Sequence, residues 1–85
     1  MPKIDIYTTP YCPFCHAAKS LLQAKGAQYE EIDVLDEAVR AKMTARANGR
    51  RTVPQIFIGE VHVGGYDDMA ALERRGALDP LLNGA

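Results

Sequence analysis

The sequence has little of several features that mark large classes of protein. Its two cysteines are too few for the disulfide framework of a small secreted protein. Ten Lys and Arg residues are balanced by eleven Asp and Glu residues, so the charge does not favour nucleic acid or an anionic membrane as a bulk partner. No segment approaches the roughly 18 apolar residues that cross a bilayer. We therefore expect neither a nucleic-acid-binding protein nor a membrane protein.

What is present is typical of one globular domain. Hydrophobic residues make up 47% of the chain and charged residues 25%, and its 85 residues leave room for a single domain, residues 1–85. The apolar stretch at residues 1–7 is too short and too interrupted for a signal-peptide core. We therefore expect a cytoplasmic protein, in which thiols stay reduced.

Apolar spacing and turn residues predict strands alternating with helices. Strands are expected at residues 3–8, 27–34, 55–58 and 61–63, and helices at 13–25, 36–47 and from Asp67 or Asp68 to Arg75, with a last short turn at 79–82. Gly59-Glu60 suits a type II′ hairpin turn. The order predicts an α/β fold, in which a right-handed parallel crossover and a hairpin form a four-stranded mixed sheet with helices on its faces.

The two cysteines, Cys12 and Cys15, are three positions apart at the predicted junction of a strand and a helix. Pro13 between them suits the first turn of a helix. The unpaired N–H groups and the dipole at a helix N-terminus stabilise a thiolate, which is the reactive form of cysteine. Cys12 is expected to be exposed there, and Cys15, one turn further on the apolar side, to be shielded. This asymmetry predicts a nucleophile and a resolving thiol.

Three other interpretations of the pair stay open at this point. With His16, the run reads Cys-x-x-Cys-His, the attachment motif of c-type haem, for which Met43 or Met69 would be the distal ligand. Two Cys and two His, including His62, are enough in number for a structural zinc site. The cysteines are alternatively buried and inert, and His16 a solvated helix residue.

A second signature lies forty residues further on, where Thr52-Val53-Pro54 directly precedes an apolar strand. Proline is tolerated at the first residue of a strand, and its peptide bond is sometimes cis. The motifs C-P-F-C, T-V-P-Q-I-F-I and G-G-Y-D-D, in this order, resemble those of a glutaredoxin, most closely the small bacterial dithiol type. The resemblance extends from Ile4 to Leu82.

The resemblance implies a thioredoxin fold with three to four helices and a glutathione site. Pro54 would be cis and face the Cys12 sulfur, and the Val53 backbone would pair with the cysteinyl part of glutathione like an added strand. Gly65 would allow close approach of the backbone. The amides at the start of the third helix would hold the γ-glutamyl carboxylate, and an Asp carboxylate its ammonium. The implied binding residues are Phe14, Arg51, Thr52, Val53, Pro54, Gly65, Tyr66, Asp67 and Asp68.

Two positions depart from the family pattern. Phe14 stands where Tyr is common, so the ring is kept and the hydroxyl is lost. Thr9 stands where many members carry a Lys that pairs with the glycyl carboxylate of glutathione. Arg50 or Arg51 is expected to replace that Lys, and if Arg51 does so, Arg51→Ala raises the KM for glutathione substrates more than it lowers turnover. Lys42, Arg46 and Arg50 follow helical spacing and form either a basic stripe beside the site or a solvated face.

The activity implied is glutathione-dependent thiol–disulfide exchange on protein disulfides and glutathione mixed disulfides. The expected partners are glutathione and oxidised or glutathionylated proteins, ribonucleotide reductase among them. The chain is expected to act as a monomer, with no metal and no permanently bound cofactor. Two alternatives stay open. One is a redoxin reduced by thioredoxin reductase. The other is a glutaredoxin that carries an iron–sulfur cluster between two subunits, which the Pro13 position and the two thiols disfavour.

Overall fold

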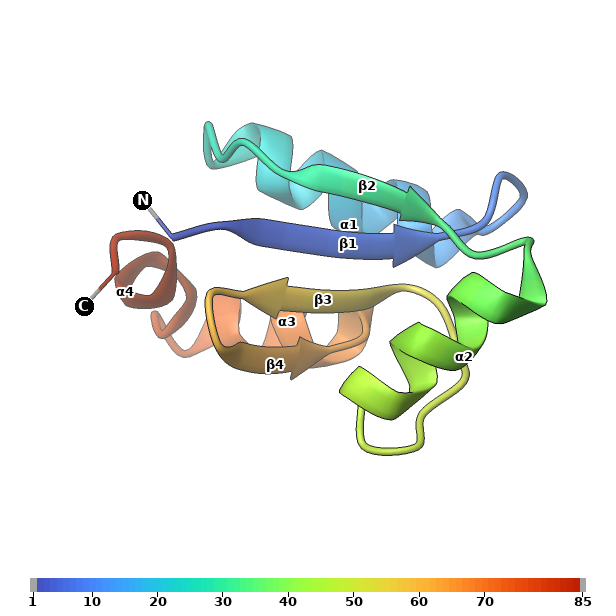
Figure 1. The fold of residues 1–85 in the computed structure, drawn as a ribbon. Coiled ribbons are helices and arrows are strands. Elements are labelled where there is room, and N and C mark those ends of the chain that lie inside the picture. The colour runs from blue at the N-terminus through green and yellow to red at the C-terminus, as the bar shows by residue number, and fades with distance from the viewer. Residues whose placement is uncertain (1, 85) are drawn as a thin grey trace.

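The computed structural model describes residues 2–84. Its strands are β1 (Ile4–Thr8), β2 (Glu30–Asp33), β3 (Gln55–Ile58) and β4 (Val61–Gly64), and its helices are α1 (Pro13–Ala24), α2 (Glu37–Arg46), α3 (Tyr66–Arg74) and α4 (Leu78–Leu82). Figure 1 shows the strands side by side with the helices around them. Among residues 2–84 no helix has both the length and the apolar character needed to cross a membrane.

The sheet has the order β2-β1-β3-β4, with β1 and β2 parallel and the other neighbours antiparallel. The predicted four-stranded mixed sheet is therefore confirmed. The second strand is shorter than the predicted 27–34, because β1 pairs only with residues 30–33. Gly59, at the predicted hairpin turn, has a φ of +57°, which glycine adopts without steric cost.

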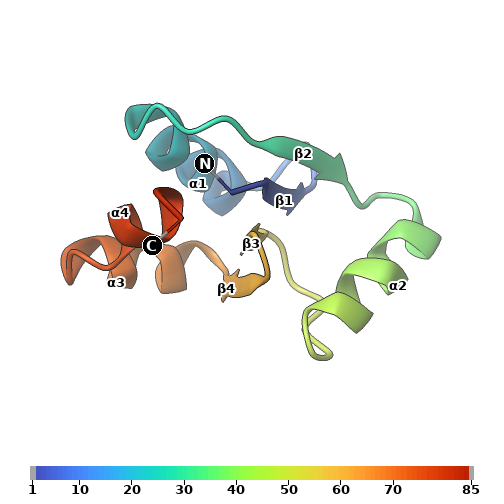
Figure 2. The same ribbon diagram turned by 60° about the vertical axis from the view of Figure 1, so that its left-hand side comes forward.

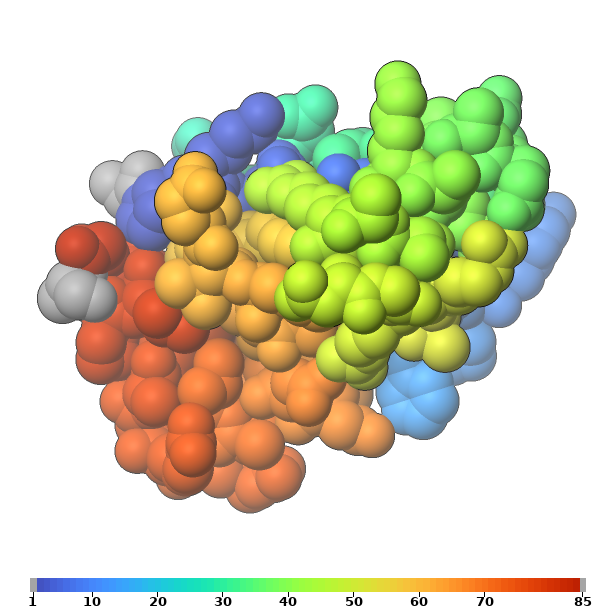
Figure 3. Space-filling view, turned by 60° about the horizontal axis from the view of Figure 1, so that its bottom comes forward, coloured from blue at the N-terminus to red at the C-terminus, as the bar shows by residue number. Residues whose placement is uncertain are grey.

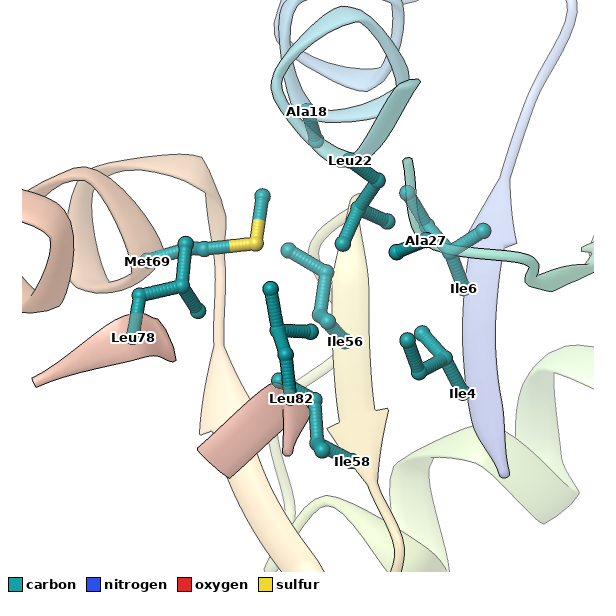
Figure 4. Close-up of a cluster of buried hydrophobic side chains, with 10 residues drawn as sticks. All are labelled: Ile4, Ile6, Ala18, Leu22, Ala27, Ile56, Ile58, Met69, Leu78 and Leu82. Carbon is teal, nitrogen blue, oxygen red and sulfur yellow. The ribbon is translucent and has the colours of Figure 1, made fainter. Parts of the chain in front are cut away.

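The two faces of the sheet are covered differently. Helices α1, α3 and α4 pack on one face, and α2 packs on the other (Figure 2). The first face holds a wholly apolar cluster with Leu22 of α1, Ile56 of β3 and Met69 of α3 near its centre (Figure 4). The cluster under α2 is smaller and includes Tyr7 and Phe57. Because β1 lies between these clusters, all five of its residues are buried.

Aspartate side chains cap the start of α2 as predicted and the start of α3 in a different way. Asp36 caps α2 as predicted, its carboxylate accepting the Ala38 N–H at 2.7 Å. Helix α3 begins at Tyr66, earlier than predicted, with Gly65 as its N-cap. Asp68 contributes from inside the first turn, where its Oδ2 accepts the Gly65 N–H at 2.8 Å. The predicted capping by Asp67 or Asp68 was therefore misplaced, because a carboxylate inside the first turn can reach back to the cap.

Candidate active site

Cys12 is the N-cap residue of α1. Pro13 follows it at the start of the helix and disfavours helical backbone at the residue before it, and Cys12 is accordingly extended, with φ −116° and ψ 105°. This conformation points its sulfur back over the first turn, where Sγ accepts the Cys15 N–H at 3.1 Å. A sulfur in this position receives the N–H groups of the helix end, which favour negative charge.

The two sulfurs differ in accessibility. Cys12 is 9% exposed and Cys15 is fully buried, and both are free thiols. The prediction that Cys12 is the more accessible of the two sulfurs is confirmed. The prediction that Cys12 is exposed was wrong in degree, because the segment that contains Val53 lies against it. Burial, together with the hydrogen bond to Cys12, raises the pKa of Cys15 to about 12. Cys15 is thus held as a neutral thiol at physiological pH.

The segment before β3 brings a second chain region to the Cys12 sulfur. The Val53–Pro54 peptide bond is cis, as predicted. The Cys12 thiol donates to the Val53 carbonyl oxygen over 3.7 Å, although the two residues are 41 positions apart. A backbone carbonyl from this segment therefore lies beside the Cys12 sulfur.

A groove of about 140 Å³ runs from this point to the start of α3. Its lining consists of Phe14, Arg50, Thr52, Val53, Pro54, Gly65, Tyr66, Asp67 and Asp68. In Figure 3 the blue N-terminal end of α1, the yellow segment after α2 and the orange start of α3 meet at one end of the molecule. The structure thus brings together every predicted binding residue except Arg51. A larger hollow, near the first residues of β1, is lined by neither cysteine.

The two neighbouring arginines point to different partners. Arg50 lines the groove, and its guanidinium donates to Asp68 Oδ2 at 3.2 Å. Arg51 pairs with Glu37 of α2 at 2.5 Å, and within residues 2–84 it is not part of the groove lining. The predicted basic stripe is also divided, since Arg46 turns toward the sheet and donates to Asp5 at 2.8 Å. Arg50 is therefore the arginine in position to meet an anion in the groove.

The start of α3 is shaped by Gly64 more than by Gly65. Gly64 has a φ of +110°, and a Cβ there would collide with the Asp68 carboxylate and come within 2.7 Å of the Arg50 guanidinium. Gly65 has room for a Cβ, whose nearest neighbour would be the Pro54 oxygen at 3.6 Å. Packing that only glycine permits therefore occurs at Gly64, and the close approach of glutathione to the Gly65 backbone stays a prediction. The Gly65 N–H and then Arg50 lower the pKa of Asp68, which keeps this carboxylate charged.

Two exposed aromatic side chains flank Cys12. Phe14 is 59% exposed and stacks on Tyr66 with ring centroids 6.3 Å apart, so it closes one side of the groove. Tyr11 is 92% exposed and was not selected from the sequence. The sequence did hold a signal for this residue, because Tyr11 lies next to Cys12 in the segment between a predicted strand and a predicted helix. These rings offer apolar surface near the Cys12 sulfur.

The haem and zinc interpretations of the cysteine pair do not fit the geometry. Met43 and Met69 are fully buried in separate apolar clusters, so neither is placed to ligate a haem at the surface. His62 is bonded to Gln55 at 2.7 Å. Among residues 2–84 no group of three or more His, Cys, Asp and Glu side chains could hold a metal ion, so the predicted zinc alternative lacks its four ligands.

Comparison with known proteins gives a consistent result. A family model described as Glutaredoxin matches residues 4–63. The chain is 48% identical over 82 residues to "Glutaredoxin 3" of Escherichia coli strain K12, covering 96% of this chain and 99% of that protein. It is 53% identical over 83 residues to "Glutaredoxin" of Pseudomonas aeruginosa, covering 98% and 99%.

Solved structures agree with the sequence comparison. A crystal structure of a buckwheat glutaredoxin–glutathione complex matches with a TM-score of 0.89 and 32% identity, over 98% of this chain and 78% of that one. The solution structure of a glutaredoxin from Brucella melitensis matches with a TM-score of 0.85 and 55% identity, over 96% and 89%. The likeness includes fold, sequence and length.

Proposed function

This chain belongs to the glutaredoxin family and is a glutathione-dependent thiol–disulfide oxidoreductase with a thioredoxin fold, and we propose that Cys12 is its nucleophile and Cys15 its resolving thiol. The observation that carries this assignment is the difference between the two sulfurs. Cys12 accepts an N–H bond at the helix end and retains some exposure, whereas Cys15 is fully buried and protonated. Cys12 is therefore the sulfur that an incoming disulfide reaches, and the thiolate is the form that attacks.

The reaction on a glutathione mixed disulfide has two exchanges. In the first, the Cys12 thiolate bonds to the glutathione sulfur, and the target leaves as a thiolate that takes a proton from water. In the second, the thiolate of another glutathione attacks the same glutathione sulfur, so that glutathione disulfide forms and the Cys12 thiolate returns. The glutathione of the mixed disulfide and one free glutathione become glutathione disulfide, the target is released as a thiol, and Cys15 takes no part.

A protein disulfide requires Cys15. Cys12 first forms a mixed disulfide with the target, and Cys15 then attacks Cys12 Sγ, which releases the second target thiol and leaves Cys12–Cys15 oxidised. Burial raises the pKa of Cys15, and so do the hydrogen bond and the charge of Cys12. Once Cys12 is in a disulfide, the contributions from Cys12 are removed, and the Cys15 proton is lost more readily. Two glutathiones reduce the pair again.

The groove beside Cys12 supports a proposal for how glutathione is held. The Val53 backbone lies next to the sulfur and pairs with the cysteinyl part of glutathione in the manner of an added strand. Arg50, as the arginine of the groove, supplies the positive charge that binds a carboxylate of glutathione. The N-terminal amides of α3, at Tyr66 and Asp67, meet the γ-glutamyl carboxylate, and Asp68 meets its ammonium. The buckwheat complex with glutathione supports glutathione as co-substrate.

The setting of the reaction is also a proposal. We expect the protein to act as a monomer in the cytoplasm on oxidised or glutathionylated proteins, ribonucleotide reductase included, without a permanently bound cofactor. The exposed Tyr11 and Phe14 rings provide apolar surface for such proteins around Cys12. If thioredoxin reductase reduced this protein instead of glutathione, the groove would have no glutathione to bind. A coupled assay with each reductant distinguishes these two modes of reduction.

The central test compares wild type, Cys12→Ser and Cys15→Ser on two substrates, a glutathione mixed disulfide and a protein disulfide. Cys12→Ser is expected to lose both activities, because no nucleophile remains. Cys15→Ser is expected to keep deglutathionylation and to lose reduction of the protein disulfide. Loss of both activities in Cys15→Ser would contradict the assigned roles.

A further inference from the structure

Gln55, the first residue of β3, carries a fully buried polar side chain in a sheet whose other buried positions are mostly apolar. It directly follows Pro54, and its amide nitrogen donates to two atoms of Thr52, the carbonyl oxygen at 3.1 Å and Oγ1 at 3.2 Å. Buried amides are costly unless they are bonded, so these contacts hold both groups in place. Gln55 thus ties the rigid sheet to the segment that lines the groove.

His62 of β4 completes the arrangement from the neighbouring strand. Its Nε2 lies 2.7 Å from Gln55 Oε1, and its ring stacks on Phe57 with centroids 4.7 Å apart. Because the Thr52 carbonyl oxygen only accepts, the NH₂ group of Gln55 must face Thr52 and its oxygen must face His62. His62 must therefore carry a proton on Nε2 and donate it.

The charges around His62 favour the neutral form of the ring. Burial lowers its pKa, and the nearby cations Arg50 and Arg46 lower it further, while Asp68 acts in the opposite direction. Neutral imidazole has one N–H, and the bond to Gln55 fixes it on Nε2. The ring thus serves as a fixed donor that orients the Gln55 amide.

We propose that Gln55 and His62 are positioning residues, which through the chain of hydrogen bonds from His62 to Gln55 to Thr52 hold residues 52–54 at the distance from Cys12 that glutathione requires. This inference rests on the proposed function, since it takes the groove as the glutathione site. Neither side chain lines the groove or touches the Cys12 sulfur within residues 2–84. Their effect is therefore on the affinity for glutathione substrates rather than on the chemical step.

The test uses four variants of the full chain with a mixed disulfide of glutathione and 2-mercaptoethanol. Gln55→Met keeps the volume but removes the donor to Thr52, and His62→Leu removes the donor to Gln55. His62→Gln restores an amide donor on a side chain of similar reach. His16→Leu is the matched control, because it removes an exposed histidine.

The expected result is a separation of KM from kcat. Gln55→Met raises KM by about tenfold and His62→Leu by about threefold with kcat nearly unchanged, the pattern of lost binding common to ground and transition state. His62→Gln returns KM most of the way to wild type, and His16→Leu leaves it unchanged. In NMR spectra, Gln55→Met shifts the backbone amide signals of Thr52 and Val53, and nitrogen shifts of wild type show His62 protonated on Nε2.

The outcomes distinguish this inference from the function on which it rests. Arg50→Ala reports on the groove itself and is measured in parallel. If Arg50→Ala raises KM while Gln55→Met leaves both KM and the signals of residues 52 and 53 unchanged, the positioning role is refuted and the groove stands. If Gln55→Met shifts the amide signals of residues 52 and 53 but neither Gln55→Met nor Arg50→Ala changes KM, the groove is refuted as the glutathione site. A failure of His62→Gln to improve on His62→Leu refutes the part assigned to His62.

Discussion

The two sides of the active site are built in different ways. The sulfur side is local, since Cys12, Pro13 and Cys15 are within one helical turn and their arrangement follows from the helix end itself. The groove side is assembled from separate places in the chain, the segment after α2 and the start of α3, together with Phe14. It is held by side-chain bonds such as that of Arg50 with Asp68.

This difference suggests that the sulfur side and the groove side have different functions. A thiolate needs a helix end, which a short motif supplies, and partial access, which the segment containing Val53 limits. Recognition of a tripeptide needs charged groups at defined separations, which only tertiary structure supplies. Changes on the sulfur side are therefore expected to alter reactivity, and changes on the groove side to alter affinity. The predictions below test this separation, from the largest expected effect to the smallest.

The first prediction concerns selective alkylation of the two cysteines. At pH 8, iodoacetamide is expected to modify Cys12 at least about a thousandfold faster than Cys15, because the thiolate is the reactive form. Cys15 is fully buried, and burial first, then Cys12, raises its pKa to about 12. Peptide mapping by mass spectrometry measures the two rates, and protein unfolded in guanidinium is the control in which both react. Comparable rates in the folded protein would contradict the asymmetry of the sulfur side.

The second prediction compares two neighbouring arginines on the groove side. Arg50→Ala is expected to raise KM for a glutathione mixed disulfide by about tenfold with little change in kcat, since a charge-assisted bond to the substrate is lost. Arg51→Ala is expected to change KM by less than about twofold, because Arg51 pairs with Glu37 instead. Steady-state kinetics of the two variants decide between them. A larger effect of Arg51→Ala would show that Arg51, one of the expected binding residues, meets the substrate in place of Arg50.

The case of these arginines shows what the sequence could and could not predict. Local rules correctly predicted the strand at 55–58, the Asp36 cap and the helix that starts at Pro13. They could not choose between Arg50 and Arg51, because two adjacent residues in a loop have no periodicity and their direction depends on Glu37 and Asp68. The resemblance to glutaredoxins added the cis Pro54, which no propensity rule requires.

The residues whose burial could not be predicted from the sequence lie where long-range packing determines their exposure. Gln55 is a polar residue at a strand end, which usually indicates a solvated position, yet it is fully buried because Thr52 and His62 satisfy its amide. Cys12 is less exposed than a helix end implies, because a segment 41 residues away covers it. Long-range contacts of this kind leave no signal in the local pattern.

The third prediction tests the charge at the α3 end of the groove. Asp68→Asn is expected to raise KM by about threefold, since an amide oxygen still accepts the Gly65 N–H but the charge toward Arg50 and the substrate ammonium is lost. The same variant changes the acid stability. The Gly65 N–H and Arg50 hold the folded-state pKa of Asp68 below its ordinary value of 3.8. The carboxylate therefore stabilises the fold above that pH, and this stabilisation is lost as the pH falls through the folded-state pKa.

Urea unfolding at a series of pH values measures this effect. Below about pH 4, the free energy of unfolding is expected to fall more steeply for wild type than for Asp68→Asn. Asp67→Asn is the matched control for stability, because Asp67 is exposed at the same helix end. An equal slope in wild type and Asp68→Asn would show that the Asp68 carboxylate contributes nothing to the groove's electrostatics.

The smallest effect is expected at Phe14, the one groove residue that comes from the sulfur side. Its ring stacks on Tyr66 and makes apolar contact only, so Phe14→Leu is expected to raise KM by about twofold without changing the rate of Cys12 alkylation. Phe14→Tyr restores the hydroxyl common in the family and is expected to match wild type, because the ring is the part that closes the groove. If Phe14→Leu instead slowed alkylation of Cys12 while leaving KM unchanged, Phe14 would act on the sulfur, and the separation between reactivity and affinity would fail at the residue where the two sides meet.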